Sequence, residues 1–108
     1  MHVPAVTRLG DDTNGVCDIG SGCCPHSRTG VNGTVSNNVF VNSLGAHRLN
    51  DTGPTQCPHG GNFTSSSASS TVFVNGKGVT RIGDVTICQQ CSEKGSHVSG
   101  STNVFAGG

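Results

Sequence analysis

Cysteine and histidine are the residues through which this sequence could do chemistry. They form two short pairs, Cys24-Pro25-His26 and Cys57-Pro58-His59, and a third cluster is Cys88-Gln89-Gln90-Cys91. Thiolate sulfur and imidazole nitrogen suit tetrahedral zinc, and two ligands close in sequence let a short loop hold the ion at little entropic cost. The pattern predicts a structural metal site that draws on all three loops.

The number of cysteines leaves a second interpretation open. Six cysteines in 108 residues exceed what one ion can use, and in a secreted protein they would indicate disulfides. The start, Met1-His2-Val3-Pro4, has neither a basic nor an apolar signal region, so we expect no signal peptide and synthesis in the cytoplasm. A disulfide from Cys17 to Cys23 or Cys24 could still form late, in an assembled particle released into an oxidising medium.

Other function classes find little support in the sequence. A hydrolytic metalloenzyme needs an open coordination position and a nearby general base, but the chain has no HExxH motif and Glu93 is its only glutamate. We therefore predict that the protein is not an enzyme. A formal net charge of zero, with 11% charged residues, also argues against binding to nucleic acid.

Two segments that must position these loops occur three times. The first ends in Arg, an apolar residue, Gly or Asn, and then Asp, at residues 6–11, 46–51 and 79–84. The second is Val-Phe followed by Val or Ala, at residues 38–42, 71–75 and 103–107. Such β-branched and aromatic runs predict short strands, and Asn75-Gly76 is a two-residue hairpin signal.

The repeats predict how the strands pair. Residues 72–74 should turn through 75–78 and return as 79–82, and residues 39–41 should do the same through 43–45. The third Val-Phe strand has no return strand after it, so we expect residues 104–106 to pair with residues 7–9. This closure predicts three equivalent units with pseudo-threefold symmetry and no frayed terminal edge.

The chain is about the length of one domain, which we place at residues 1–108. Only 31% of the residues are hydrophobic and 17 are glycine, so we expect the metal to substitute for a missing apolar core. Three stretches rich in Gly, Ser, Asn and Thr contain all six cysteines: 12–36, 52–69 and 85–101. We expect them to be irregular loops that converge at one end.

The remaining polar residues receive plainer interpretations. His47 stands where the other repeats carry Thr7 and Thr80, so we expect a surface or strand-pairing residue, and we assign no role to His2 or His97. The repeated Arg could face a partner or pair with the nearby Asp, which we expect to make turn hydrogen bonds. These residues are Arg8, Arg48 and Arg81, with Asp11, Asp51 and Asp84.

The segment Pro4-Ala5-Val6-Thr7-Arg8-Leu9-Gly10-Asp11 resembles the Pro-Ala-Ala-Arg segment that names the PAAR family. Val-Phe-Val-Asn-Gly followed by Arg-Ile-Gly-Asp, and the final residues 103–108, are similar to its phage members. The resemblance covers essentially the whole chain. It implies a small conical all-β domain of three hairpin repeats, with a wide base and one metal ion near the vertex.

The resemblance also implies the metal, which is zinc, with iron as the alternative. Family members of this kind use three His and one Cys, whereas here Ser21 and residues 55–56 stand where His is expected. Cys88 is preferred to Cys91 because it follows Asp84 by four residues, as the family pattern places its third-loop Cys. The predicted ligands of the single ion are His26, Cys57, His59 and Cys88. The reserve ligands are Cys23, Cys24 and Cys91.

The function that the resemblance implies is structural. The chain would be the tip of the central spike of a contractile phage tail or injection system, located at the tail or baseplate and in transient contact with the target envelope. One copy would cap a trimeric spike of the VgrG or gpV kind, each hairpin meeting one subunit. The absence of an added effector domain favours a phage over a type VI secretion system. The alternative is a small zinc-binding adaptor or adhesin module.

Overall fold

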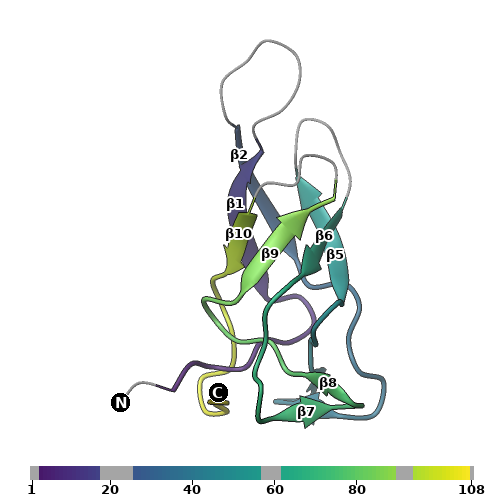
Figure 1. Ribbon diagram of the computed structural model, residues 1–108. Coiled ribbons are helices and arrows are strands. Elements are labelled where there is room, and N and C mark those ends of the chain that lie inside the picture. Colours follow the sequence, from purple (N-terminus) through teal and green to yellow (C-terminus); the bar gives the residue numbers. More distant parts are fainter. Residues whose placement is uncertain (1–2, 18–25, 57–61, 90–93, 108) are drawn as a thin grey trace.

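The computed structural model describes residues 3–17, 26–56, 62–89 and 94–107, and every regular element in these ranges is a strand (Figure 1). Six strands form a closed antiparallel barrel in the order β1-β10-β9-β6-β5-β2. They are β1 (Asp12–Cys17), β2 (His26–Val31), β5 (Thr52–Gln56), β6 (Asn62–Ser65), β9 (Val85–Cys88) and β10 (Lys94–His97). No helix in the described ranges is long and apolar enough to cross a membrane. The prediction of an all-β protein is confirmed.

The barrel corrects the expectation that residues 12–36, 52–69 and 85–101 are irregular. Each stretch contains a long hairpin, and neighbouring hairpins pair through β1 with β10, β2 with β5 and β6 with β9. The inward positions of these strands carry small polar residues such as Thr13, Ser65 and Thr86, all of which are buried. Because polar residues alternate with other polar residues, no hydrophobic period of two marks these strands in the sequence.

Both hairpins predicted from the Val-Phe-Val runs are present, but their turns are shorter than predicted, because residues 77–78 and 44–45, which the sequence predicts to lie in the turns, form the return strands. Strand β3 (Phe40–Val41) pairs with β4 (Leu44–Gly45), and β7 (Phe73–Val74) pairs with β8 (Lys77–Gly78). Asn75 and Gly76 have φ values of 55° and 78°, and Asn42 and Ser43 have 54° and 69°. Positive φ at both central residues is the backbone of a type I′ turn, whose twist matches that of the flanking strands.

The two ends of the chain pair as predicted, but in a different register. Ala5 lies opposite Phe105, the Val6 amide donates to the Val104 carbonyl at 3.0 Å, and the Ala106 amide donates to the Pro4 carbonyl at 3.0 Å. The C-terminal strand therefore meets residues 4–6, and the predicted partner, residues 7–9, is wrong. Thr7 is unavailable because it has already turned into the centre of the molecule.

The three copies of the Arg-containing segment meet at that centre through a ring of backbone hydrogen bonds. Thr7 donates to the Thr80 carbonyl at 2.9 Å, Thr80 donates to His47 at 3.0 Å, and His47 donates to Thr7 at 3.2 Å. Beside this ring lies the apolar core, to which every repeat contributes: Val6, Val41, Ala46, Val74, Val79 and Ala106. The small apolar core thus lies between the two hairpin sheets and the polar lumen of the barrel.

The repeated Arg and Asp residues pair locally. This confirms the interpretation that each Arg pairs with the nearby Asp. Arg Nε and the Asp carboxylate lie 2.8, 2.7 and 2.8 Å apart for Arg8–Asp11, Arg48–Asp51 and Arg81–Asp84. The same carboxylate oxygen accepts the backbone amide of its Arg, which confirms the turn role of the Asp residues. The other end of each guanidinium reaches an adjacent unit, at Asn42, Asn75 or the Gly107 carbonyl. These pairs therefore join the units to one another.

Candidate functional site

Two of the four predicted metal ligands, His26 and Cys88, have their backbones at one end of the barrel. Strands β1, β5 and β9 all run toward this end (Figure 1). The backbone of His26 begins β2 opposite Cys17, and Cys88 ends β9 opposite Phe63. Two predicted ligands, Cys57 and His59, lie outside the described residues, as do the reserves Cys23, Cys24 and Cys91.

Cys88 is the predicted ligand whose side chain is described. It is fully buried, and the alternation along β9 places it with Thr86 on the inner face of the barrel. A thiol there lies at the end of the lumen nearest the three connections. Within the described residues no group of three or more His, Cys, Asp or Glu side chains could hold an ion. The ligand set therefore stays a prediction.

Two buried histidines are the functional candidates that sequence reasoning missed. His47 and His97 are 0% and 1% exposed, so the expectation of a surface position for His47 is wrong. Their Nε2 atoms each lie 2.8 Å from the hydroxyl of Ser65, and His47 Nδ1 lies 2.8 Å from the Thr34 carbonyl. The sequence did contain one indication that His47 is buried: it occupies the same position in its repeat as Thr7 and Thr80, with which it forms the central ring.

The histidines and Phe63 fill the lumen together. The ring centroids are 5.2 Å apart for His47 and His97, 6.0 Å for Phe63 and His97, and 6.1 Å for His47 and Phe63. Phe63 is fully buried, and Gly53 makes room for it. The barrel is thus packed by a few large rings with small residues around them.

Replacing Gly53 tests this packing. A β-carbon there would overlap the Val31 carbonyl oxygen and lie 2.7 Å from Cε2 of Phe63. We expect Gly53→Ala to lower the free energy of unfolding by about 3 kcal/mol, measured by urea denaturation. The control is Gly107→Ala, where a β-carbon meets nothing within 4 Å. Equal stability of the two variants would contradict the packing of Phe63 against Gly53.

Burial sets the protonation state of the two histidines. Desolvation lowers the pKa of His47 from 6.5 to about 4. Desolvation, together with the neighbouring His47, lowers the pKa of His97 to about 3. Both imidazoles are therefore neutral at pH 7, and their proton distribution is decided by their hydrogen bonds.

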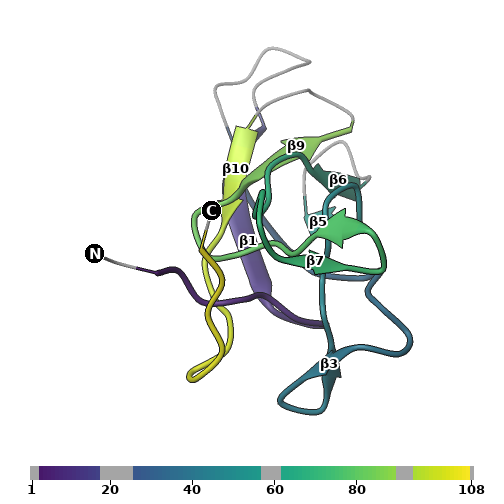
Figure 2. The ribbon, with the colours of Figure 1, turned by 60° about the horizontal axis from the view of Figure 1, so that its bottom comes forward.

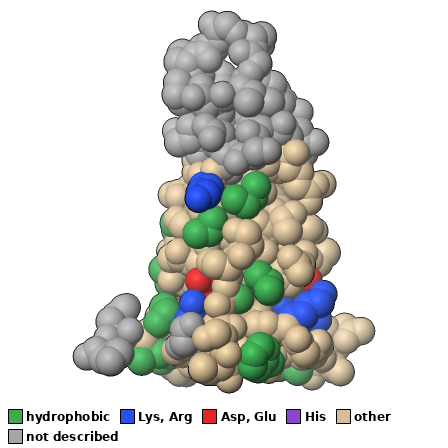
Figure 3. Space-filling view, viewed as in Figure 1, with side chains coloured by type: hydrophobic (Ala, Val, Ile, Leu, Met, Phe, Trp, Pro, Cys, Tyr) green, Lys and Arg blue, Asp and Glu red, His purple; other side chains and the backbone are tan. Residues whose placement is uncertain are grey.

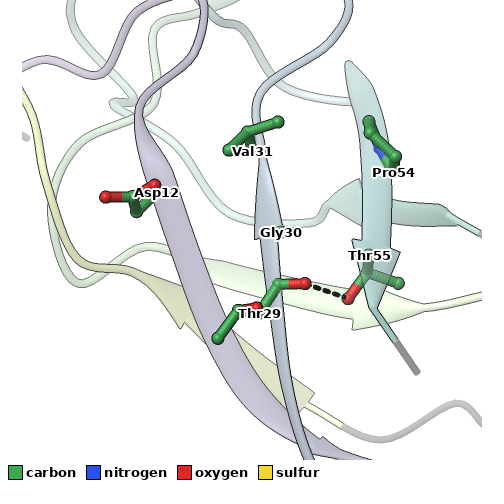
Figure 4. A pocket seen from close by; sticks show the side chains of 6 residues that line it. All are labelled: Asp12, Thr29, Gly30, Val31, Pro54 and Thr55. Atoms are coloured by element: carbon green, nitrogen blue, oxygen red, sulfur yellow. Dashed lines mark hydrogen bonds between the residues drawn. The ribbon is translucent and has the colours of Figure 1, made fainter. Parts of the chain in front are cut away.

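A small cavity opens on the outside of the barrel between β1, β2 and β5 (Figure 4). Its volume is about 210 Å³, below the range typical of ligand pockets, and its lining is Asp12, Thr29, Gly30, Val31, Pro54 and Thr55. The Thr55 hydroxyl donates to the Thr29 carbonyl at 3.2 Å. Asp12 is the one ionisable residue of the lining, so the cavity holds no acid–base pair.

The opposite end of the molecule presents apolar side chains. Phe40, Phe73 and Phe105 occupy equivalent positions in the three Val-Phe segments and are 61%, 59% and 54% exposed. Figure 2 brings this end forward and shows the β3 segment, the β7 hairpin and the C-terminal segment spread around it. Apolar side chains are also visible along the lower rim in Figure 3. We call this surface the base. Large apolar side chains exposed together at one end of a protein are typical of an interaction surface.

These features define a small all-β protein with a closed barrel at one end and three aromatic side chains exposed at the other. Residues 21–89 and, overlapping them, residues 55–108 match the PAAR motif. The chain therefore belongs to the PAAR motif family, which in general is associated with the spike tips of contractile injection systems. A comparison with curated proteins finds no match.

Proposed function

We propose that the chain is the structural tip of the central spike of a contractile phage tail, where one copy caps a trimeric spike protein. A type VI secretion spike would use the same surfaces. The observation that carries this proposal is the base, with Phe40, Phe73 and Phe105 similarly exposed on three equivalent segments. Membership of the PAAR motif family supports the same assignment.

Pseudo-threefold symmetry explains how one chain meets three subunits. Each unit contributes one backbone hydrogen bond to the central ring, and each unit contains one Arg–Asp pair. Each unit therefore presents its phenylalanine in a similar setting, and each phenylalanine docks on one subunit of a trimer. The barrel then points away from the spike, so that the end opposite the base meets the target envelope. The work is mechanical and needs no catalytic group.

Binding to the trimeric spike tests the proposal. We expect one chain per trimer by native mass spectrometry, and Phe73→Ser should weaken binding at least tenfold because it removes one of three buried aromatic anchors. The control is Val31→Ser on barrel strand β2, which removes a side chain that is 40% exposed outside the base. No affinity for the spike, or three copies per spike, would contradict the proposal.

We also propose that a single zinc ion closes the barrel end opposite the base, bound by His26, Cys57, His59 and Cys88. Two observations support it: the Cys88 thiol is buried at this end of the lumen, and the His26 backbone begins β2 at the same end. Structural zinc is bound by four protein ligands and contributes directly to folding. It would tie together barrel hairpins whose lumen is lined mainly by small polar residues.

Metal analysis tests the zinc site. We expect the purified protein to contain about one zinc per chain and to lose thermal stability sharply when a chelator is added, since metal binding is coupled to folding. His59→Ala should be less stable than His2→Ala, which alters only the first residues of the chain. Absence of metal from natively assembled protein, or equal stability of the two variants, would contradict the site.

A further inference from the structure

The hydrogen bonds of the lumen fix the tautomers of both buried histidines. A carbonyl oxygen only accepts, so His47 Nδ1 must carry the proton that it donates to Thr34. Neutral His47 then has a bare Nε2, which accepts the hydroxyl proton of Ser65. The Ser65 oxygen in turn accepts from His97 Nε2, which must carry the proton of that ring. The chain of donors and acceptors has one possible direction.

This direction leaves an acceptor atom without a donor at the end of the hydrogen-bond network. Neutral His97 protonated at Nε2 has an unprotonated Nδ1, and this atom is buried without a hydrogen-bond partner. Among the residues that the structure describes, two other buried atoms share that condition: Thr13 Oγ1 and Asn32 Oδ1, in residues that are each 1% exposed. A buried polar atom without a partner costs about 1–3 kcal/mol, so three such atoms in one small protein call for a common explanation.

The strand register brings the three residues together. Thr13 on β1 lies directly opposite His97 on β10. On the other side of β1, the Asn32 amide donates to the Asp11 carbonyl at 3.0 Å, which places Asn32 diagonally across from Thr13. Both Thr13 and Asn32 are buried, and Nδ1 is the ring nitrogen nearer the β10 backbone. Thr13 is thus a cross-strand neighbour of both His97 and Asn32, at the spacing of about 5–8 Å that is usual for such pairs, and it lies between them on the inner face of the barrel.

We propose that these three atoms form a binding site for one ordered water molecule inside the barrel. The water donates one hydrogen to His97 Nδ1 and the other to Asn32 Oδ1, and it accepts the hydroxyl proton of Thr13. Every donor then has an acceptor, and the hydrogen-bond network that begins at the Thr34 carbonyl ends at the water. Three hydrogen bonds are the usual number for a buried structural water.

A metal cation fits the same atoms less well than water does. The nearest carboxylates, Asp11 and Asp84, are already neutralised by their ion pairs with Arg8 and Arg81. The three candidate ligands are neutral, so a divalent ion would be buried without compensating charge, which is strongly unfavourable. Water provides the two hydrogens that the acceptors lack.

The test uses the intact wild-type protein. A crystal structure at a resolution that defines solvent, or a neutron structure, should show one water within about 3.2 Å of the three atoms. Nitrogen NMR should show His47 protonated at Nδ1 and His97 protonated at Nε2. An anomalous scatterer in the site, a direct bond from the Thr13 hydroxyl to His97 Nδ1, or His97 protonated at Nδ1 would overturn the proposal.

Matched variants of the threonine provide a second readout by magnetisation transfer from buried water to nearby amides. Thr13→Val keeps the shape but removes the hydroxyl, so the water signal should be lost or strongly reduced, and Thr13→Ser should restore it. The control is Thr86→Val on β9, which is buried to a similar extent. This control should keep the signal. A signal that persists unchanged in Thr13→Val would overturn the site.

Discussion

Lowering the pH from 7 to 5 is expected to reduce the free energy of unfolding by about 4 kcal/mol. His47 and His97 have folded-state pKa values of about 4 and about 3, against 6.5 in the unfolded chain. Below pH 6.5 the unfolded state therefore binds more protons than the folded state. The stability that comes from burying neutral rings is complete above that pH and is lost progressively as the pH falls toward the folded values.

The measurement is urea denaturation at several pH values between 7 and 5, with zinc held in excess. Proton competition for metal ligands would add its own pH dependence, so the contribution of the lumen is isolated by comparing variants. His97→Asn installs the residue that Asn32 carries at the equivalent backbone position, and it should reduce the pH dependence by about half. His2→Ala is the control and should leave it unchanged. A wild-type stability that is flat from pH 7 to 5 would contradict this prediction.

Removing residues 103–108 is expected to open the molecule and cause aggregation, seen by size-exclusion chromatography together with loss of a cooperative thermal transition. The deleted strand carries Ala106, which is 2% exposed within the apolar core, and the strand pairs with residues 4–6. The Gly107 carbonyl also accepts hydrogen bonds from Ser69, Thr71 and Arg81. The deletion therefore exposes strand edges and core at once.

A point variant tests whether the packing of residues 103–108 in the core, and not only their presence in the chain, keeps the molecule closed. Ala106→Asp places a charge in the apolar core and should cost about 3–5 kcal/mol or abolish folding. Its neighbour Phe105 is 54% exposed, so Phe105→Ser should leave the fold intact while weakening attachment at the base. A truncated protein that remains monomeric and as stable as the full chain would show that the ends do not hold the molecule closed.

The parts of the fold that the sequence predicted are those with local signals. Asn75-Gly76 between two apolar runs specifies its hairpin, and the triplicated Arg-to-Asp segment specifies its own turn through one carboxylate. The register of the two ends could not be predicted in this way. It depends on Thr7 turning inward to join Thr80 and His47, which is a contact among three distant segments.

The polar lumen explains why the sequence predicted neither the barrel strands nor the buried histidines. Most inward positions of the barrel strands hold Thr, Ser, Gly or His, which in a sequence resemble loop residues, so the sequence predicts loops where the structure has strands. The sequence predicts ordinary positions for His47 and His97 for the same reason, although both occupy places that the repeats make equivalent to small buried residues. The metal ligands Cys57 and His59 lie outside the described residues, so that part of the site stays a prediction.

The pairing of the first strands with the last also governs when the protein can fold. Ala5 pairs with Phe105 and Thr13 pairs with His97, so the barrel cannot close before residue 97 has left the ribosome, and the base cannot close before residue 105 has. Contacts so distant in sequence make folding slow, and each earlier stage exposes unpaired strand edges. Translation must therefore pass residue 105 before both the barrel and the base are closed, and a copy that stalls before that residue becomes a substrate for chaperones and proteases.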